Sequence, residues 1–338
     1  SIGPTLQKAD ELARNVLQAP PELIDNTLLM AEPEDSFETG AIKPDTTLDP
    51  VSLEPQLPPE QVGPMLLRQA AVDGDPRAQF EVAAIYSEGQ ALEKDLAKAA
   101  EWYRFAAEKG FAPAAFRLGG LYEAGKGVER DLDKARHWYE KAAEAGNRMA
   151  MHNLAALYAG GELGNQEFGK ASEWFRKAAE LGLADSQFNL GMLNARGLGI
   201  PQDMAESYKW FSLAAARGDE DAAKARDEVA RSLDAATVDR LHGEISSWQQ
   251  GQMDIKANFA PIGTWSEEFN PGQDIVDRGI VEKVQIALNR LGYDVGIPDG
   301  IMGPRTREAI KDFERTTGMT ESGAVNPRLL AVLGSQPV

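Results

Sequence analysis

The sequence has 338 residues, carries 53 acidic and 35 basic side chains for a formal net charge of −18, and contains no cysteine. This length allows two or three domains, and the excess of carboxylates disfavours a nucleic-acid surface, which needs clustered Lys and Arg to neutralise phosphates. The absence of cysteine excludes disulfides, thiolate zinc sites, iron–sulfur clusters and a cysteine nucleophile, and no apolar run approaches the ~18 residues of a membrane span.

The N-terminal segment, residues 1–57, is rich in proline and acidic residues. Residues 1–60 contain 12 acidic and 3 basic residues, so half of the net charge lies in under a fifth of the length. Such a segment cannot bury enough apolar surface to offset its loss of chain entropy on folding. We therefore predict a disordered acidic tether over residues 1–57.

Residues 58–250 are organised by a repeat of 36 residues. Three kinds of marker share this spacing: Gly74, Gly110, Gly146, Gly182 and Gly218; Gly89, Gly125, Gly161 and Gly197; and Trp102, Trp138, Trp174 and Trp210. A fixed period of this length indicates a solenoid, in which each unit buries its apolar face against its neighbours.

Each repeat is predicted to be a helix–turn–helix hairpin. In the first unit Asp75 and Pro76 are typical of a helix start, and Gly89 is typical of its end. Asp95 begins a second helix that closes at Gly110. The later units repeat these features, with Asp131, Glu167 and Asp203 as the corresponding caps and small residues at Ala83, Gly119, Ala155 and Gly191 for close helix contact.

This pattern resembles the Sel1-like repeat, a relative of the tetratricopeptide repeat (TPR). The string GGLYEAGKGVERDLDKARHWYEKAA at 119–143 carries it best, and the departures are His152, Asn194 and Ser207. We expect about four repeats, a leading cap at 58–72 and trailing caps at 222–233 and 235–250. Such repeats generally bind peptides or partner helices in a groove, and we expect the repeat tryptophans to be core rather than a sugar platform.

Residues 251–273 are predicted to connect the solenoid to a C-terminal module. Glycine and proline punctuate this connector, which also carries Phe259, Trp265 and Phe269. A freely disordered linker would have fewer aromatic residues. We therefore expect part of the connector to lie against a folded surface.

The C-terminal module, residues 274–333, is predicted to have three short helices around a small core. It resembles the type 1 peptidoglycan-binding domain, through Gln285, Leu288, Leu291-Gly292-Tyr293, Asp299-Gly300, Gly303, Thr306, Ala309, Phe313 and Gly318. Glu314 departs from that family, which usually has glutamine there. The resemblance implies binding to murein. The whole fold is thus predicted to be all-α, a Sel1-like (TPR-like) solenoid followed by a small three-helix domain.

Four residues of the module are candidates for contact with peptidoglycan: Tyr293, Asp299, Arg305 and Arg307. Murein peptides present carboxylates and amides, for which Arg offers planar, multidentate hydrogen bonding. Two alternatives remain open at this stage. Asp299 could only shape the Asp-Gly turn, and Tyr293 could only close the core.

The sequence offers no catalytic constellation. His137, His152 and His242 lack metal-ligand spacing, and no serine nucleophile elbow, phosphate-binding loop or dinucleotide fingerprint is present. The many carboxylates are explained by solvated helix faces. We predict that the chain is not an enzyme and has no catalytic residues, no cofactor and no metal site.

The order of tether, Sel1-like solenoid and murein-binding module resembles the periplasmic part of the polar organelle development family of alphaproteobacteria. Residues 57–89, LPPEQVGPMLLRQAAVDGDPRAQFEVAAIYSEG, carry this resemblance most specifically. It implies a periplasmic scaffold at the cell pole, part of a single-pass inner-membrane protein whose span lies upstream. Its partners would be peptidoglycan and periplasmic or membrane proteins for pilus or holdfast assembly. The alternative is a targeting or regulatory subunit that recruits a cell-wall hydrolase or a signalling protein to murein.

Overall fold

The computed structural model describes residues 54–89 and 92–337, and the regular elements of these residues are all helical. The tether predicted over 1–57 lies outside this range except for its last four residues. No helix among the described residues is long and apolar enough to cross a membrane. The predicted all-α fold of a solenoid followed by a small helical domain is confirmed.

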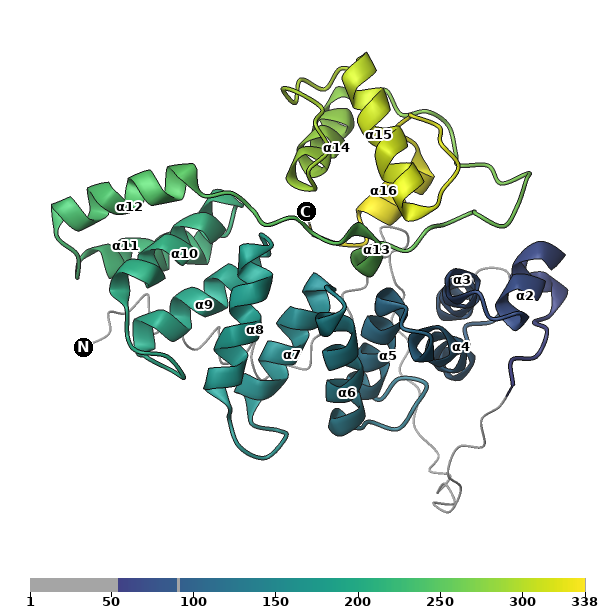
Figure 1. Cartoon of the computed structure of the whole chain (residues 1–338), viewed down its shortest axis with the longest axis horizontal. Coiled ribbons are helices and arrows are strands. Elements are labelled where there is room, and N and C mark those ends of the chain that lie inside the picture. The colour runs from purple at the N-terminus through teal and green to yellow at the C-terminus, as the bar shows by residue number, and fades with distance from the viewer. Residues whose placement is uncertain (1–53, 90–91, 338) are drawn as a thin grey trace.

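Antiparallel helix pairs stack side by side into an arc (Figure 1). The pairs are α3 (Pro76–Glu88) with α4 (Leu96–Glu108), α5 (Ala112–Ala124) with α6 (Leu132–Glu144), α7 (Arg148–Gly160) with α8 (Phe168–Glu180), and α9 (Ala184–Arg196) with α10 (Met204–Ala216). The predicted hairpins are therefore confirmed, and each helix of these pairs has 13 residues.

Local hydrogen bonds explain where these helices begin and end. The Asp75 carboxylate accepts from the backbone N–H groups of Arg77 and Ala78, and Gly89 ends α3 with a left-handed φ of 69°. Asp95 caps α4 in the same way, as do Asp131 and Asp203 at their helices. Glu167 lies at the N-cap position of α8 as predicted, but its side chain accepts no capping hydrogen bond.

The small residues inside the hairpins are required by close aromatic neighbours. A Cβ atom on Gly119 would lie 2.6 Å from Cδ1 of Tyr139, and one on Gly191 would lie 2.8 Å from Cδ1 of Phe211. Both rings are completely buried. The predicted role of these positions in close helix packing is confirmed.

The three departures from the repeat pattern keep the hairpins intact by satisfying their own polar atoms. Ser207 Oγ donates to the Gly191 carbonyl at 2.8 Å, and Asn194 Nδ2 donates to the carbonyl one turn earlier. His152 Nδ1 lies 2.7 Å from Ser186 Oγ. Of the repeat tryptophans, Trp102 and Trp210 are buried, whereas Trp138 and Trp174 are partly buried against the same core.

Both ends of the array are capped, with boundaries that differ from those predicted. The single leading helix expected over 58–72 is instead a 3-10 turn, η1 (Glu60–Val62), followed by α2 (Met65–Val72). Gly63, with φ of 150°, and Pro64, which has no N–H, interrupt the helix there. The trailing helices are α11 (Glu220–Ala230) and α12 (Ala235–Ser247), each ending three residues earlier than predicted.

The C-terminal module consists of α14 (Arg278–Arg290), α15 (Pro304–Thr317) and α16 (Pro327–Leu333). These are the three predicted helices, and Leu288, Ile310 and Phe313 are completely buried between them. Glu314 is also completely buried. Its carboxylate is compensated there by a pair with Arg328 Nη2 at 2.5 Å and by the backbone N–H of Gly323, which donates to it at 2.8 Å. The departure from glutamine thus supplies a charge that this module uses internally.

Candidate functional site

The connector is packed into the core of the C-terminal module. Its short helix α13 (Ile255–Asn258) is preceded by the buried Met253, and the Phe259 ring that follows lies edge-on to Phe313 at 5.4 Å. Ile255 is buried in the same cluster. The prediction that part of the connector lies against a folded surface is confirmed.

The opposite side of the connector is fastened to the solenoid at the turn between α6 and α7. Asn147 Nδ2 donates to the Ala257 carbonyl at 2.8 Å, and the backbone N–H of Arg148 donates to Asn258 Oδ1 at 2.8 Å. Asn258 Nδ2 donates to the Gly146 carbonyl at 3.0 Å. A single asparagine of the connector therefore both accepts from and donates to this inter-repeat turn.

Arg148 completes a buried polar centre between the solenoid and the module. Its guanidinium donates to the Leu181 carbonyl at 3.0 Å and to the Pro337 carbonyl, and its side chain is completely buried. Gln336 Nε2 donates to both the carbonyl and Oδ1 of Asn258, each at 3.1 Å. Burial, with a smaller effect of nearby Arg217, lowers the pKa of Arg148 to about 9, so it stays charged at neutral pH.

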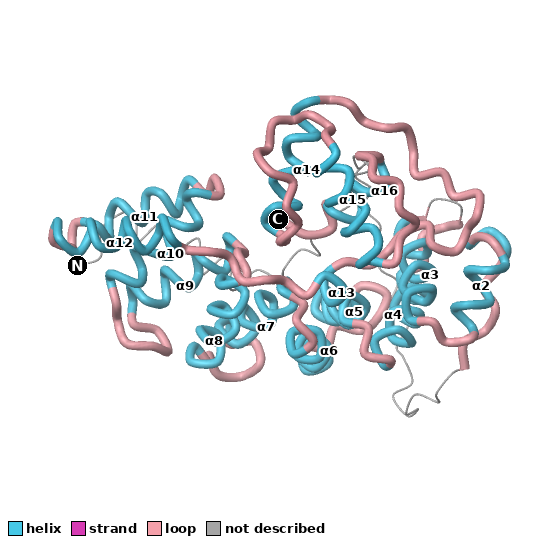
Figure 2. The backbone as a smooth tube through the Cα atoms, turned by 45° about the horizontal axis from the view of Figure 1, so that its top comes forward, coloured by secondary structure: helices cyan, strands magenta, loops and turns pink. Residues whose placement is uncertain are grey.

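The connector follows the inter-repeat turns in the reverse order of the repeats (Figure 2). Near α12 the backbone N–H of Gly251 donates to the Glu180 carbonyl at 2.8 Å. At the far end the Arg77 guanidinium lies over the Trp265 ring at 5.5 Å, next to α3. The chain then turns back to α14, and the module lies on the side toward which the ends of the arc bend (Figure 1).

Among the predicted ligand residues, Asp299 shapes the turn that contains it. Its Oδ1 accepts from the backbone N–H of Ile301 at 2.9 Å and from Gln285 Nε2 at 3.1 Å. These hydrogen bonds hold the pKa of Asp299 below its usual range. The carboxylate is exposed, so one face of it remains open to solvent.

The two predicted arginines lie in the first turn of α15. Arg305 is exposed and pairs with the exposed Asp294, whose pKa is lowered by that hydrogen bond. Arg307 is also exposed. Both side chains are exposed at the start of α15, next to the loop of residues 291–303 that joins α14 to α15.

Tyr293 is half-buried and lies apart from the other three candidates. Its ring is edge-on to Phe313 at 5.9 Å, and burial raises the pKa of its hydroxyl. It lines a cavity that Asp299, Arg305 and Arg307 do not reach. The structure therefore does not bring the four predicted residues into one pocket.

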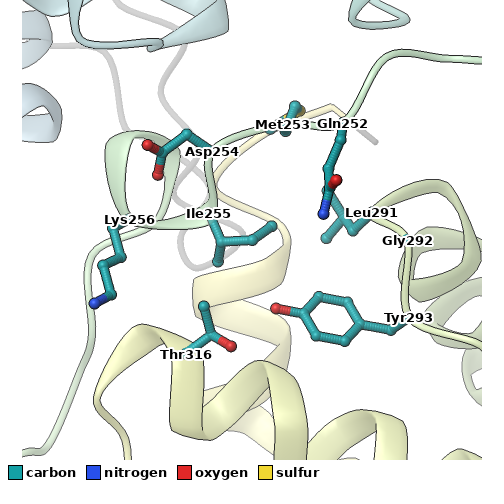
Figure 3. Close-up of a pocket in the computed structure, with 9 residues that line it drawn as sticks. All are labelled: Gln252, Met253, Asp254, Ile255, Lys256, Leu291, Gly292, Tyr293 and Thr316. Carbon is teal, nitrogen blue, oxygen red and sulfur yellow. The ribbon is translucent and has the colours of Figure 1, made fainter.

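The cavity at Tyr293 has a volume of about 430 Å³ and is formed jointly by the connector and the module (Figure 3). The connector contributes residues 252–256, the module contributes residues 291–293, and Thr316 comes from α15. In Figure 3 the Tyr293 hydroxyl points between Ile255 and Thr316, while Gln252 approaches from the other side.

A second cavity of about 640 Å³ lies between the solenoid and the module. The solenoid contributes residues 75–77 and 110–112, and α15 contributes its C-terminal end, residues 315–318. Asp254, Lys256 and Thr316 line both cavities. Sequence reasoning missed both cavities, because no local pattern marks residues that meet only when the module docks.

Comparison with known protein families agrees with this architecture. Residues 76–111, 112–147, 148–183 and 184–219 each match the family described as "Sel1 repeat". This part of the chain therefore has the Sel1-repeat solenoid fold. Residues 277–333 match the family described as "Putative peptidoglycan binding domain". Modules of these two kinds typically act in interactions rather than catalysis, and no enzyme family is indicated for the chain.

Two solved structures are similar to this chain, each over a different share of its length. A Sel1 repeat protein from Oxalobacter formigenes is 35% identical over 47% of this chain and 46% of that chain, with a TM-score of 0.44. A protective antigen of uropathogenic Escherichia coli strains is 27% identical over 74% of this chain and 55% of that chain, also with a TM-score of 0.44. The matches thus span about half the length of each relative. None of the curated proteins compared with the chain matches it.

Proposed function

We propose that the chain is a non-enzymatic scaffold that docks partner proteins on its Sel1 solenoid and is attached to peptidoglycan through its C-terminal module. The observation that carries this proposal is the buried centre of Arg148, Asn258 and Gln336. It joins the module to the array of repeats, so a bound partner and the cell wall would keep a fixed spacing. A flexible linker between the two parts would not serve this purpose.

The distribution of charge supports a wall-facing C-terminal end. Residues 274–333 contain 8 basic and 9 acidic residues, whereas the whole chain has a net charge of −18. The module is therefore repelled far less by the anionic wall polymer than the rest of the chain. We place murein contacts at Arg305, Arg307 and the open face of Asp299, and a separate contact at Tyr293, which lines a cavity that the other three residues do not reach.

The finer part of the proposal is a role at the cell pole. The order of the parts resembles the periplasmic region of the polar organelle development protein PodJ, and this resemblance supports a single-pass inner-membrane protein that organises pilus or holdfast assembly. A fluorescent fusion of the full-length protein is then expected to collect at one pole. Uniform fluorescence around the cell would contradict this part alone.

Co-sedimentation of the whole chain with purified murein sacculi tests the wall attachment. We expect the wild-type chain to pellet and Arg305→Ala to pellet less. Arg240→Ala is the matched control, because Arg240 is a similarly exposed, ion-paired arginine on α12, far along the chain from the module. Truncation before the module is a poor control, since it would expose Phe259 and Met253. A wild-type chain that remains in the supernatant would refute the attachment.

Crosslinking of the whole chain in envelope extracts tests the scaffold role by the identity of the proteins retained. Pilus or holdfast components would support the polar function. A murein hydrolase or a signalling protein would instead support the targeting or regulatory alternative.

A further inference from the structure

The two cavities adjoin each other, because Asp254, Lys256 and Thr316 line both. We call the two cavities together the junction groove, which has Tyr293 in its first part and Arg77, at the start of α3, in its second. We propose that the junction groove binds the peptide stem of murein, an extended peptide that carries free carboxylates. This inference rests on the proposed wall attachment and names the part of the polymer that is recognised.

Three basic residues, Arg77, Lys256 and Arg315, and two acidic residues, Asp75 and Asp254, line the junction groove. Arg77 pairs with Asp75 at 3.2 Å, and Arg315 pairs with Asp312 and Glu321, each at 2.7 Å. Lys256, in contrast, forms no hydrogen bond or ion pair with any residue that the structure describes.

The acidic residue nearest to Lys256 in sequence uses one carboxylate oxygen to cap a helix. Asp254 Oδ1 accepts the backbone N–H of Ala257 at 3.1 Å, which caps α13. The junction groove therefore has one exposed ammonium at its centre, and a ligand carboxylate would pair with it.

The walls of the junction groove also suit a peptide. Tyr293 offers a hydroxyl and Gln252 offers an amide, and both groups can donate to and accept from peptide bonds, whereas the Thr316 hydroxyl, which donates to the Asp312 carbonyl at 2.7 Å, can only accept. In the connector the buried Met253 and Ile255 alternate with the lining residues Gln252, Asp254 and Lys256, so this part of the wall is held in place by the core. The cavity volumes of about 430 and 640 Å³ fall in the range of sites for short ligands.

The same geometry disfavours the glycan strand and the isolated module. A glycan freed of its peptides keeps the lactyl carboxylates of its muramic acid residues, but it has no peptide backbone to bond to Tyr293, Thr316 and Gln252. Residues 252–256 of the connector and residues 75–77 of the solenoid supply much of the lining. Full affinity would therefore require the module to be docked on the repeats.

The test compares two charge reversals in the whole chain, Lys256→Glu and Lys283→Glu. Lys283 is the matched control, because it is an exposed lysine on α14 that lines neither cavity. Both substitutions change the net charge equally, so general repulsion from the wall is the same. The readouts are sedimentation with sacculi and calorimetric titration with soluble stem peptide released from murein by an amidase.

We expect Lys256→Glu to weaken both readouts by about tenfold or more, the loss of one charge-assisted hydrogen bond, and Lys283→Glu to leave them unchanged. If the wild type pellets and the two variants behave alike, the junction groove is not the site although the wall attachment stands. Equal binding of peptide-free glycan strands would overturn the choice of ligand. If the wild-type chain binds soluble peptide but does not pellet with sacculi, the wall attachment is overturned and the junction groove remains a peptide site. If it neither binds the peptide nor pellets, both proposals are overturned.

Discussion

Adding a single methyl group at Gly119 is expected to destabilise the protein, although alanine is the better helix former. In an open helical position Gly→Ala stabilises by about 1 kcal/mol. At Gly119 the new Cβ would meet Cδ1 and Cε1 of Tyr139 at 2.6 and 2.8 Å. Overpacking of this kind costs about 1–3 kcal/mol, so the sign depends on whether the ring can move.

The ring of Tyr139 is held in place by its hydroxyl. This hydroxyl donates to Glu123 Oε2 at 2.6 Å and accepts from Asn153 Nδ2 at 3.3 Å. Moving the ring would weaken a buried hydrogen bond worth about 1 kcal/mol. We therefore expect Gly119→Ala to lower the free energy of unfolding by about 2 kcal/mol after the gain in helix propensity.

Two other glycines provide a graded comparison by urea unfolding followed by circular dichroism. Gly191→Ala should destabilise less, because Phe211 has no polar atom to restrain its ring. Gly243→Ala should stabilise by up to about 1 kcal/mol, because Gly243 is exposed in α12 and a Cβ there meets no atom within 4 Å. From highest to lowest urea midpoint, the expected order is thus Gly243→Ala, wild type, Gly191→Ala and Gly119→Ala. A Gly119→Ala chain as stable as the wild type would refute the packing argument.

Three further predictions concern buried or capping carboxylates. Burial raises the pKa of Glu123 to about 8, so the contribution of the protonated carboxyl to stability is complete below the unfolded pKa of about 4.5 and is lost as the pH rises through 8. Between pH 5 and pH 8 the urea midpoint of Glu123→Gln should therefore fall less than that of the wild type. An equal fall in the two proteins would contradict this. Glu314→Gln should cost about 3–5 kcal/mol because it leaves the buried Arg328 unpaired, and Arg328→Met in the same chain should restore part of that loss in thermal melts. Asp95→Ala should cost about 1 kcal/mol through the lost cap, whereas Glu167→Ala should cost under about 0.5 kcal/mol; equal losses in chemical denaturation would argue against the capping assignment.

The solenoid could be predicted from the sequence because the repeat states the same pattern several times. Glycine ends such as Gly89 and caps such as Asp95 act through residues only a few positions away, so local spacing is enough to find them. The break at Gly63 and Pro64 was missed for the opposite reason. It lies before the first repeat and has no counterpart in the later ones, so no repeated pattern marks it, and the apolar residues on either side favour a continuous helix.

The docking of the module could not be predicted in the same way. Asn147 and Ala257 are 110 residues apart, and Arg148 and Pro337 are 189 apart. Asn147 by itself is typical of a helix cap, and it does cap α7, so nothing in the sequence indicated its second bond to the connector. The junction groove depends on this long-range contact, and its Lys256 is inconspicuous in the linear sequence.

The place where the module is fastened determines how a mechanical load would spread through the molecule. A pull on the C-terminal module reaches the array chiefly through the hydrogen bonds of Arg148 and Asn258, at the boundary between the second and third of the four repeats, with further contacts at Glu180 and Arg77. Tension entering at a terminal repeat would peel the helices off one pair at a time, each resisting alone. Tension entering at the middle crosses only the repeats that lie between this boundary and the other point of attachment, and the several hydrogen bonds of the buried centre bear it in parallel.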